Sequence, residues 1–424
     1  MSSSVTIDAG DVLPRNSITA WLVCLSAGLF FFYEFFQLNI FDVINLPLRH
    51  DFHLDATELS WMSSTYLWAD ILFLLPAGII LDRFSTRLVI LIAMFLCVIG
   101  TFGFALTNSF YWACFFHFLS GIGNAFCFLS CVVLVSRWFP PRRQAFVIGL
   151  LVTMAFLGGM MAHTPFARLN ELYGWRNSLL LDGALGILLL GWIAIIVQDS
   201  PKGRAIRKSD IQTHILSSFI RALKNRQNWL AGLYTSFLNL PIMVLCALWG
   251  ASYLEVVHQV SGFAASNIVS LIFIGSIIGC PLAGWLSDHQ GKRKPLMILG
   301  ALITLITVLP FFLGIRLTQL QLSILFFTLG FFTSTQVISY PLIAESNGKD
   351  NTGAATGLAS VLIMGGGGMG QVLFGMLMQH HAGLASNQYS IADFQYAMWM
   401  FPLTAIAGLV AVLLAKETNC KGKE

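Results

Sequence analysis

The chain contains twelve separate runs of mainly apolar residues, each long enough to cross a lipid bilayer as a helix. A spanning helix needs roughly 20 such residues, because each residue adds about 1.5 Å along the helix axis. We therefore predict an all-α integral membrane protein with twelve transmembrane helices. The runs lie near residues 18–46, 57–81, 86–107, 110–136, 144–166, 176–197, 229–253, 263–286, 295–314, 319–343, 353–379 and 392–415.

The low content of charged residues supports a lipid environment for these runs. Charged residues make up 10% of the 424 residues and hydrophobic residues 56%, whereas about 25% charged residues is typical of a soluble domain. A soluble two-domain enzyme would lack the charged surface to cover so much apolar material, and the composition also argues against a nucleic-acid-binding module. The first apolar run is too long for a cleavable signal peptide, so we expect it to remain as a membrane helix.

The longest polar segment divides the chain into two halves. Apolar residues within this segment recur at helical spacing beside basic residues, which predicts an amphipathic helix on the membrane surface. A simple linker helix and a site for a regulatory partner both fit this pattern. The predicted layout is an N-terminal tail over 1–17, a six-helix bundle over 18–197, a central loop over 198–228, a second six-helix bundle over 229–415 and a C-terminal tail over 416–424.

Basic residues fall almost entirely on one side of this layout. Twenty of the 24 lysines and arginines lie on the side of the two chain ends, and the other four are Arg49, Arg168, Arg176 and Arg316. Loops that stay in the cytoplasm are enriched in Lys and Arg. We therefore predict that both termini are cytoplasmic. Omitting or adding one helix would scramble the bias, so it also supports the count of twelve.

A short motif occurs at equivalent positions in the two halves, after the second and after the eighth apolar run, with an offset of 206 residues. Its glycine suits a close approach of two helices, and its charged residues suit a loop at the membrane surface. Two copies at half-chain spacing predict two pseudo-symmetric six-helix bundles that arose by duplication. The residues are Gly78, Asp82, Arg83 and Arg87 in the first copy and Gly284, Asp288, Gly291, Lys292 and Arg293 in the second.

The two copies resemble the loop signature of the major facilitator superfamily, G-x-L-x-D-R-x-G-R-[RK]. The first copy departs from the signature, with Ser85 where glycine is usual, and the second keeps Gly291. The segment 137–145, which begins with Arg137, resembles the RWFP-type loop of the same superfamily. The resemblance covers essentially the whole chain, since the length, the twelve runs and the central loop also agree.

The resemblance implies that the two bundles rock about a site near the middle of the membrane. It also implies that the loop carboxylates lock one of two states by pairing with basic residues. We expect Asp82 to pair with Arg137, and Asp288 to pair with Lys292, with Arg293 or with the opposite bundle. Plain anchoring of these loops at the inner surface is the alternative interpretation.

The first apolar run carries one polar–aromatic stripe. At 100° per residue, Tyr33, Glu34 and Gln37 share one face of the helix. An ionisable group at membrane depth is costly and therefore a functional candidate, and the first span lines the cavity in the superfamily. We predict that Glu34 binds a proton or the solute. A protonated Glu34 that hydrogen-bonds between helices is the alternative.

The rest of the first half offers further polar candidates. Asp70 lies in the second run, and His117 and Asn124 share an arc of the fourth run. His117 occupies the Arg position of a superfamily element, R-x-x-x-G-x-G, and could take over proton coupling because His titrates near neutral pH; a hydrogen-bonded core histidine is the alternative. Weaker candidates near the outer ends of their runs are Asp182, His163 and Asp42, of which Asp42 is expected to contact water.

The second half contributes neutral polar residues suited to orienting a small polar solute. Lys and Arg are absent from the middle of every apolar run, whereas superfamily members that carry strongly anionic solutes place Arg in the cavity. We therefore predict a neutral, zwitterionic or cationic solute. The candidates in this half are Asn239, Gln336, Tyr340 and Gln371.

These observations predict a secondary active transporter that takes up an amino-acid- or nucleoside-like solute with protons. Gly158-Gly159 lacks the preceding Gly-Pro of a superfamily antiporter element, which favours uptake. The Phe-rich first run and the RWFP-type loop also resemble the phagosomal nutrient transporters of intracellular bacteria. The alternatives are a drug or metabolite exporter that exchanges protons, and a membrane sensor that has kept the fold and lost transport.

An enzyme, a bound metal and a cofactor are not expected. The sequence has no nucleophile elbow, HExxH motif or phosphate-binding loop, and seven of its eight cysteines lie inside apolar runs without metal-ligand spacing. The predicted partners are the bilayer, the solute and protons, with no nucleic acid. The predicted setting is the bacterial inner membrane, with the monomer as the functional unit.

Overall fold

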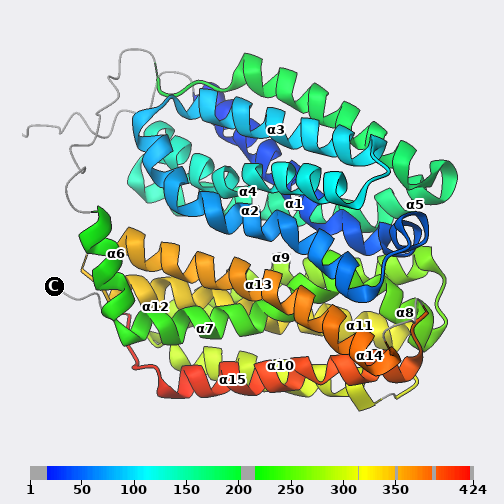
Figure 1. The fold of residues 1–424 in the computed structure, drawn as a ribbon. Coiled ribbons are helices and arrows are strands. Elements are labelled where there is room, and N and C mark those ends of the chain that lie inside the picture. The colour runs from blue at the N-terminus through cyan, green and yellow to red at the C-terminus, as the bar shows by residue number, and fades with distance from the viewer. Residues whose placement is uncertain (1–16, 202–214, 314, 349–351, 384–387, 421–424) are drawn as a thin grey trace, which may run out of the picture.

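A computed structural model describes residues 17–201, 215–313, 315–348, 352–383 and 388–420, and this described part is helical throughout, without strands. The helices form two groups, α1 to α5 and α7 to α15, which lie one above the other in Figure 1. The helix α6 (Ile215–Lys224) lies at one end of the molecule, within the central segment where an amphipathic helix is predicted. We call this end the α6 side and the opposite end the distal side.

The first group supplies six spans from five helices. The helix α5 breaks at Gly174, where φ is 77° and ψ is 161°, a backbone conformation that glycine adopts without steric cost. Each part of α5 on either side of Gly174 is long enough to cross a bilayer. The helices are α1 (Ser17–Phe52), α2 (Ala56–Arg83), α3 (Thr86–Leu106), α4 (Phe110–Trp138) and α5 (Pro141–Ile196).

The second group also supplies six spans, three of which are interrupted. One span changes to a π-helix in its middle, one contains a 3₁₀ turn and one has a break near its start. The spans are α7 (Arg226–Pro241) with η2 (Ile242–Trp249) and α8 (Gly250–His258); α9 (Gly262–Gln290); α10 (Lys294–Leu313); α11 (Gln319–Thr333) with η3 (Ser334–Ile338) and α12 (Ser339–Glu345); α13 (Thr352–Ala382); and α14 (Ile391–Met398) with α15 (Met400–Leu414).

The prediction of twelve spans in two six-helix bundles is confirmed. Ten of the described helical stretches are long and apolar enough to cross a membrane by length and composition. One of the ten, Phe146–Ile196, contains the break at Gly174 and therefore provides two spans. The 28-residue α2 provides the twelfth, packed along α4 in its own bundle and α13 in the other.

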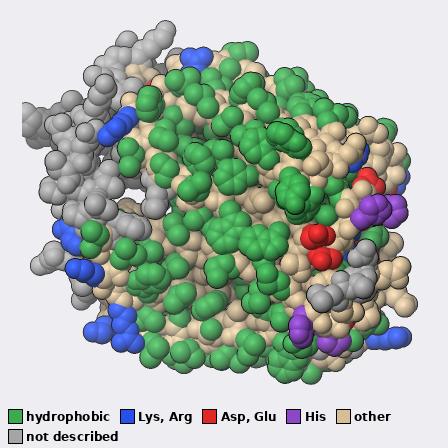
Figure 2. Space-filling model, viewed as in Figure 1, with side chains coloured by type: hydrophobic (Ala, Val, Ile, Leu, Met, Phe, Trp, Pro, Cys, Tyr) green, Lys and Arg blue, Asp and Glu red, His purple; other side chains and the backbone are tan. Residues whose placement is uncertain are grey.

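The surface fits a membrane-embedded bundle. Figure 2 shows hydrophobic side chains over the middle of one face, with most of the visible Lys and Arg at the α6 side and the visible Asp, Glu and His at the distal side. Large apolar side chains such as Leu188, Leu72 and Ile306 are more than half exposed. An apolar belt between two charged ends is the pattern expected where lipid tails surround the protein.

The helices α9 and α11 approach each other closely through glycine. A Cβ atom added at Gly330 would lie 2.0 Å from the carbonyl oxygen of Ile272, and one added at Gly275 would lie 2.3 Å from that of Phe327. Small residues let two membrane helices come into backbone contact, where van der Waals packing holds them together. This crossing therefore fixes the second bundle through backbone contacts that no larger residue would allow.

We expect Gly330→Leu to destabilise the protein by about 1 to 3 kcal/mol or more, because overpacking a backbone contact forces the helices apart. Thermal unfolding in detergent would measure this as a lowered midpoint. Gly191→Leu is the matched control, since a Cβ atom there meets nothing within 4 Å. Equal effects of the two substitutions would contradict the packing argument.

Candidate functional site

Glu34 is enclosed within the first bundle. Its side chain is fully buried, and Oε2 accepts a hydrogen bond of 2.7 Å from the hydroxyl of Tyr66 on α2. The same hydroxyl lies 2.9 Å from the backbone carbonyl of Glu34. On α4, a Cβ atom added at Gly123 would come within 2.1 Å of Oε1, so glycine leaves the room that the carboxyl group occupies. Oε1 has no hydrogen-bond partner among the described residues.

The two other members of the polar stripe on α1 turn the same way. Gln37 donates a hydrogen bond to the carboxylate of Asp182 on α5, and Tyr33 donates one of 3.4 Å to the backbone carbonyl of Asp182. All three side chains are buried. The sequence correctly grouped Tyr33, Glu34 and Gln37 on one face of the helix. That face, however, packs into the interior of the first bundle rather than onto the second.

A second polar group lies between α2 and α4. The side chains of Asp70 on α2 and Asn124 on α4 interact, and both are buried. His117 is also buried, and its ring stacks on Phe41 with centroids 4.2 Å apart. The sequence therefore predicted Asp70 and Asn124 at positions that the fold brings together.

A small cavity lies beside His117, within the first bundle. Half of its lining residues carry polar side chains. Gln37, which lines the cavity together with His117, also bonds to Asp182. The cavity is lined by Gln37, Ile40, Phe41, Thr101, Phe104, His117, Ser120 and Leu179.

The second bundle places its polar candidates near the surface between the bundles. Gln336 donates a hydrogen bond of 3.2 Å to the side-chain oxygen of Asn239, and Gln371 donates one of 2.9 Å to the carbonyl of Met243. Tyr340 packs on a small cluster of buried apolar residues that comes from both bundles, namely Leu38, Tyr66, Leu67, Met243 and Ile363. Tyr340 thus lies close to the boundary of the two halves, and Asn239 and Gln336 bond to each other within the second bundle.

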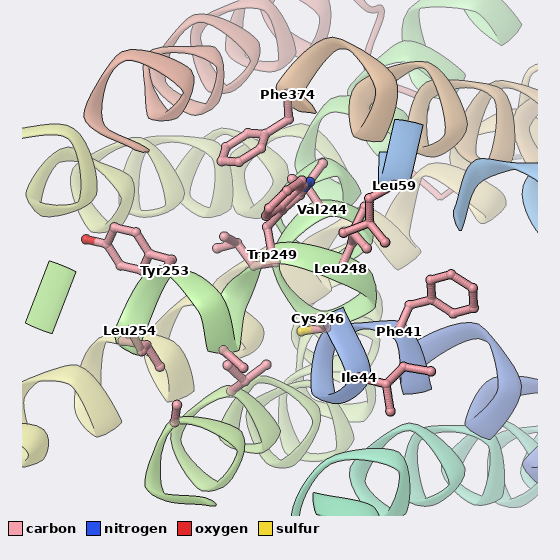
Figure 3. Close-up of a cluster of buried hydrophobic side chains, with 14 of the residues drawn as sticks. Phe41, Ile44, Leu59, Val244, Cys246, Leu248, Trp249, Tyr253, Leu254 and Phe374 are labelled. Carbon is pink, nitrogen blue, oxygen red and sulfur yellow. The ribbon is translucent and has the colours of Figure 1, made fainter. Parts of the chain in front are cut away.

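The bundles are joined in the distal half by a set of hydrogen bonds. Asn45 on α1 donates to the carbonyl of Leu248 at 2.6 Å, and Thr164 on α5 donates to Asn267 on α9, also at 2.6 Å. The indole of Trp249 donates to Ser60 on α2 at 3.3 Å. Figure 3 shows Trp249 among the buried apolar side chains of this contact, with Phe41, Ile44 and Leu59 contributed by the first bundle.

The start of α2 and the end of α1 complete this distal contact. The backbone N–H of Ala56 donates a hydrogen bond of 2.6 Å to the hydroxyl of Tyr389 and one of 3.3 Å to the side-chain oxygen of Gln379. The guanidinium of Arg49 lies 4.4 Å above the ring of Tyr389. Ala56 and Arg49 belong to the first bundle, and Tyr389 and Gln379 belong to the second. Each of these contacts therefore joins the two bundles at the distal side.

At the α6 side the first motif copy lies in a charged cluster within its own bundle. The carboxylate of Asp199 accepts hydrogen bonds of 2.5 Å from the Ser85 hydroxyl and 2.9 Å from the Arg87 backbone N–H. Arg137 lies 3.8 Å from the same carboxylate and donates to the Thr86 hydroxyl. The side chain of Asp82 lies outside the described residues, so its predicted pairing with Arg137 stays a prediction.

The second copy forms the equivalent cluster. Arg293 pairs with Asp288 at 2.5 Å and with Glu345 at 2.6 Å, which selects one of the three partners predicted for Asp288. The carboxylate of Glu417 accepts hydrogen bonds of 2.9 and 2.8 Å from the backbone N–H groups of Arg293 and Lys294. Asp199 and Glu417 therefore play matching parts, each following the last span of its bundle and binding the start of a helix.

The two motif glycines are in open positions. A Cβ atom added at Gly78 or at Gly284 would meet nothing within 4 Å among the described atoms, so neither glycine serves a close helix contact in this structure. Gly291 has φ of 64°, a left-handed conformation that ends α9. Arg83 and Lys292 complete the motif residues; Arg83 is exposed, and the Lys292 carbonyl accepts a hydrogen bond from Ser287.

One comparison with known proteins decides the family. The model of the Major Facilitator Superfamily matches residues 23–263 and 247–422. The chain belongs to the major facilitator superfamily. Proteins of this family are transporters rather than enzymes, and the chain is accordingly a multi-pass membrane transporter.

Individual relatives are distant. The Hexuronate transporter of Bacillus subtilis is 22% identical over 89% of this chain and 91% of its own length, and the Uncharacterized transporter YybO of the same organism is 23% identical over 69% of this chain and 71% of its own. These names do not include a phagosomal nutrient transporter, so that resemblance stays a prediction.

Solved structures share the fold. A D-xylose-proton symporter superimposes with a TM-score of 0.76 at 16% identity, over 95% of this chain and 99% of that one. A bacterial homologue of the human lysosomal transporter Spinster, in an inward-facing and unoccupied conformation, gives 0.74 at 18% identity, over 94% of this chain and 96% of that one. At these identities the likeness supports the fold alone.

Sequence reasoning missed several residues of this site. Asp42 was expected to contact water, but its carboxylate is enclosed between the bundles. The position of a residue within an apolar run indicates its depth in the membrane, but not which helix its side chain meets. Asp199 and Glu417 were overlooked because each lies just after a span, where carboxylates are common. Their shared position after the sixth and twelfth spans is the signal that could have identified them.

We expect Glu417→Ala to lower stability by about 0.5 to 2 kcal/mol, the usual effect of removing a helix cap. Burial alone would raise the pKa of Glu417, but backbone N–H donors outweigh burial and hold that pKa below its usual range. A group with a lowered folded pKa stabilises the protein above its unfolded pKa and loses that effect as the pH falls through the folded value. Thermal unfolding at pH 7 measures the loss of stability, and repeating it at pH 4 measures how that loss changes with pH. Lys416→Ala is the control.

Proposed function

We propose that the chain is a proton-coupled symporter for uptake of a small neutral organic solute. The observation that carries the proposal is the set of carboxyl groups buried in the first bundle, Glu34, Asp70 and Asp182. Neither Lys nor Arg occurs in the middle of any span to neutralise them. A buried charge without a partner is costly, so protons are the natural partners of this set.

The first bundle supports proton binding by its geometry. Glu34 has one carboxyl oxygen held by Tyr66 and one without a described partner. Asp182 also has one oxygen without a described partner. A proton on either group removes the cost of the buried charge, and the polar side chains of Gln37 and His117 line a neighbouring cavity.

The second bundle supports a neutral solute. Asn239, Gln336 and Tyr340 offer amide and hydroxyl groups near the boundary of the bundles, where they could orient a solute rich in hydroxyl groups or amides. A carboxylate or phosphate would need a cation that this region lacks.

The same charge bias supports the orientation. We place the α6 side in the cytoplasm of a bacterium, because the sequence assigns 20 of the 24 Lys and Arg residues to the side of the two chain ends. The hydrogen bonds of the distal contact then close the outer side. The open space at Gly78 and Gly284 fits an inward-facing state in which the inner ends of the bundles are apart.

The charged clusters at the α6 side are proposed to act as the inner gate. In the outward-facing state, Gly78 and Gly284 would contact the opposite bundle. The clusters around Arg137 and Arg293 would hold the loops in the conformation that allows this contact. The monomer is sufficient for such a cycle, because both gates lie between the two bundles of one chain.

A membrane sensor remains the second candidate function. The Membrane sensor protein UhpC of Escherichia coli is 24% identical over 67% of this chain and 69% of its own length. Binding of a solute without its flux into proteoliposomes would favour the sensor, and solute efflux driven by inward proton flow would favour an exporter.

We expect Glu34→Gln to abolish proton-driven accumulation of solute and to leave solute exchange at equal concentrations within about twofold. The amide keeps the volume and a hydrogen-bond acceptor for Tyr66 but binds no proton. Proteoliposomes with an imposed pH gradient measure accumulation, and counterflow measures exchange. Asp51→Asn, outside the bundle interior, is the matched control. Normal accumulation by Glu34→Gln would contradict this role.

We also expect Gln336→Ala to weaken solute binding by about tenfold, because an amide–solute hydrogen bond contributes about 0.5 to 1.5 kcal/mol and Asn239 also loses its partner. A thermal-shift screen of sugars, nucleosides and amino acids identifies the solute, and titration of that solute gives the affinity. Gln319→Ala, at the start of α11 on the distal surface, is the control. Unchanged affinity would place the solute elsewhere.

A further inference from the structure

We propose that Asp42 and His163 form a proton-binding site at the boundary of the two bundles, separate from Glu34. We further propose that binding of this proton closes the distal gate, by which we mean the distal contact between the two bundles. The two side chains come from α1 and α5, and both are completely enclosed. His163 Nδ1 lies 3.5 Å from Asp42 Oδ2. Only the role of this site in transport rests on the proposed function; proton binding and gating do not.

Asp42 holds the second bundle directly. Its two carboxyl oxygens accept hydrogen bonds of 2.9 and 3.1 Å from the backbone N–H of Ala251. This N–H becomes available because the helix changes there from the π-helix η2 to the α-helix α8. A change of hydrogen-bond register leaves a backbone donor that needs a partner. Asp42 supplies that partner across the gate.

The imidazole of His163 has no other polar neighbour recorded among the described residues. Both of its ring nitrogens lack a hydrogen-bond partner among the described residues, although the side chain is fully buried. The ring packs against Phe273 on α9, with centroids 5.7 Å apart. An imidazole without hydrogen bonds in an apolar site gains most from the nearby carboxylate, since a shared proton would satisfy both groups.

The other groups around the pair add to the need for a proton. Glu255 on α8 interacts electrostatically with Asp42, and Cys246 on η2 lies close to the same carboxylate. On α9 the charged side chains are Asp288 and His289, at the far end of the helix near the α6 side. Glu255 is therefore a second acid near the pair, and the other titratable group at the end of α8, His258, bonds to the hydroxyl of Tyr253.

The sign of the effect follows from the charge of the closed gate. With one proton, Asp42 and His163 are neutral overall; without it, the enclosed pair carries one negative charge. Opening the gate exposes the pair to water, which lowers the cost of that charge. The closed gate therefore binds the proton more tightly, and by linkage acid favours the closed gate. The ratio of closed to open molecules changes by at most about tenfold per pH unit for one proton.

The experiment measures the opening of the distal gate directly. Spin labels are placed on unnatural amino acids at Tyr111 and Leu320, which are exposed, lie at the distal starts of α4 and α11 and belong to different bundles. The native cysteines stay in place. Pulsed dipolar spectroscopy of the chain in nanodiscs, without solute, then gives the closed fraction between pH 5 and pH 8.

We expect the closed fraction of the otherwise unchanged chain to rise as the pH falls. Asp42→Asn should lose this closing response, Asp42→Glu should keep it, and His163→Gln should move its midpoint to lower pH. Asn45→Ala is the matched control, since it removes a non-titrating hydrogen bond of the same gate. It should lower the closed fraction at every pH and keep the response.

A closed fraction that does not change with pH in the unsubstituted chain would overturn the proposal. So would full acid-induced closing in Asp42→Asn or an unchanged midpoint in His163→Gln. Glu34→Gln separates the two claims: it should keep the gate response while losing proton-driven accumulation. A pH-sensitive gate in a chain whose transport ignores the proton gradient would refute the proposed symport and leave this site standing.

Discussion

An ionisable side chain among membrane helices must be neutral, paired or hydrated, and this constraint organises the structure. Carboxyl groups of the first bundle lie in polar pockets made by Tyr66, Asn124 and Gln37. Strong ion pairs appear instead at the α6 side, where Arg293 meets Asp288 and Glu345. Charges are thus compensated by charges only near the ends of the bundle, and by hydrogen bonds or protons at its centre.

The two ends of the bundle are built differently for this reason. The distal contact joins the bundles through hydrogen bonds to backbone groups, as at Ala251, Leu248 and Ala56. The clusters at the α6 side instead fix loops and helix starts within each bundle, through Asp199 and Glu417. One end is held by a contact between bundles, and the other keeps each bundle in a defined shape.

The sequence predicted the spans and the two-bundle architecture, because each depends on residue type along the chain. It also predicted that Tyr33, Glu34 and Gln37 share a face, since helical periodicity fixes that relation. Periodicity cannot say which neighbour a face meets when both sides offer polar partners, so the packing of this stripe against α2, α4 and α5 is known only from the structure. The π-helix η2 depends on tertiary packing and has no signal in the run Ile242–Trp249, and the same holds for the backbone N–H of Ala251 that bonds to Asp42.

Alternating access requires that the closed and open forms differ by only a few kcal/mol, so that a bound solute or proton can reverse their order. The distal contact meets this requirement, because each hydrogen bond contributes only about 0.5 to 1.5 kcal/mol net and water replaces it on opening. A single enclosed charge can outweigh several such bonds. The charge state of the enclosed pair Asp42 and His163 can therefore decide the equilibrium between the closed and open forms of the distal gate. The neutral hydrogen bonds around the pair set how far this equilibrium must be shifted.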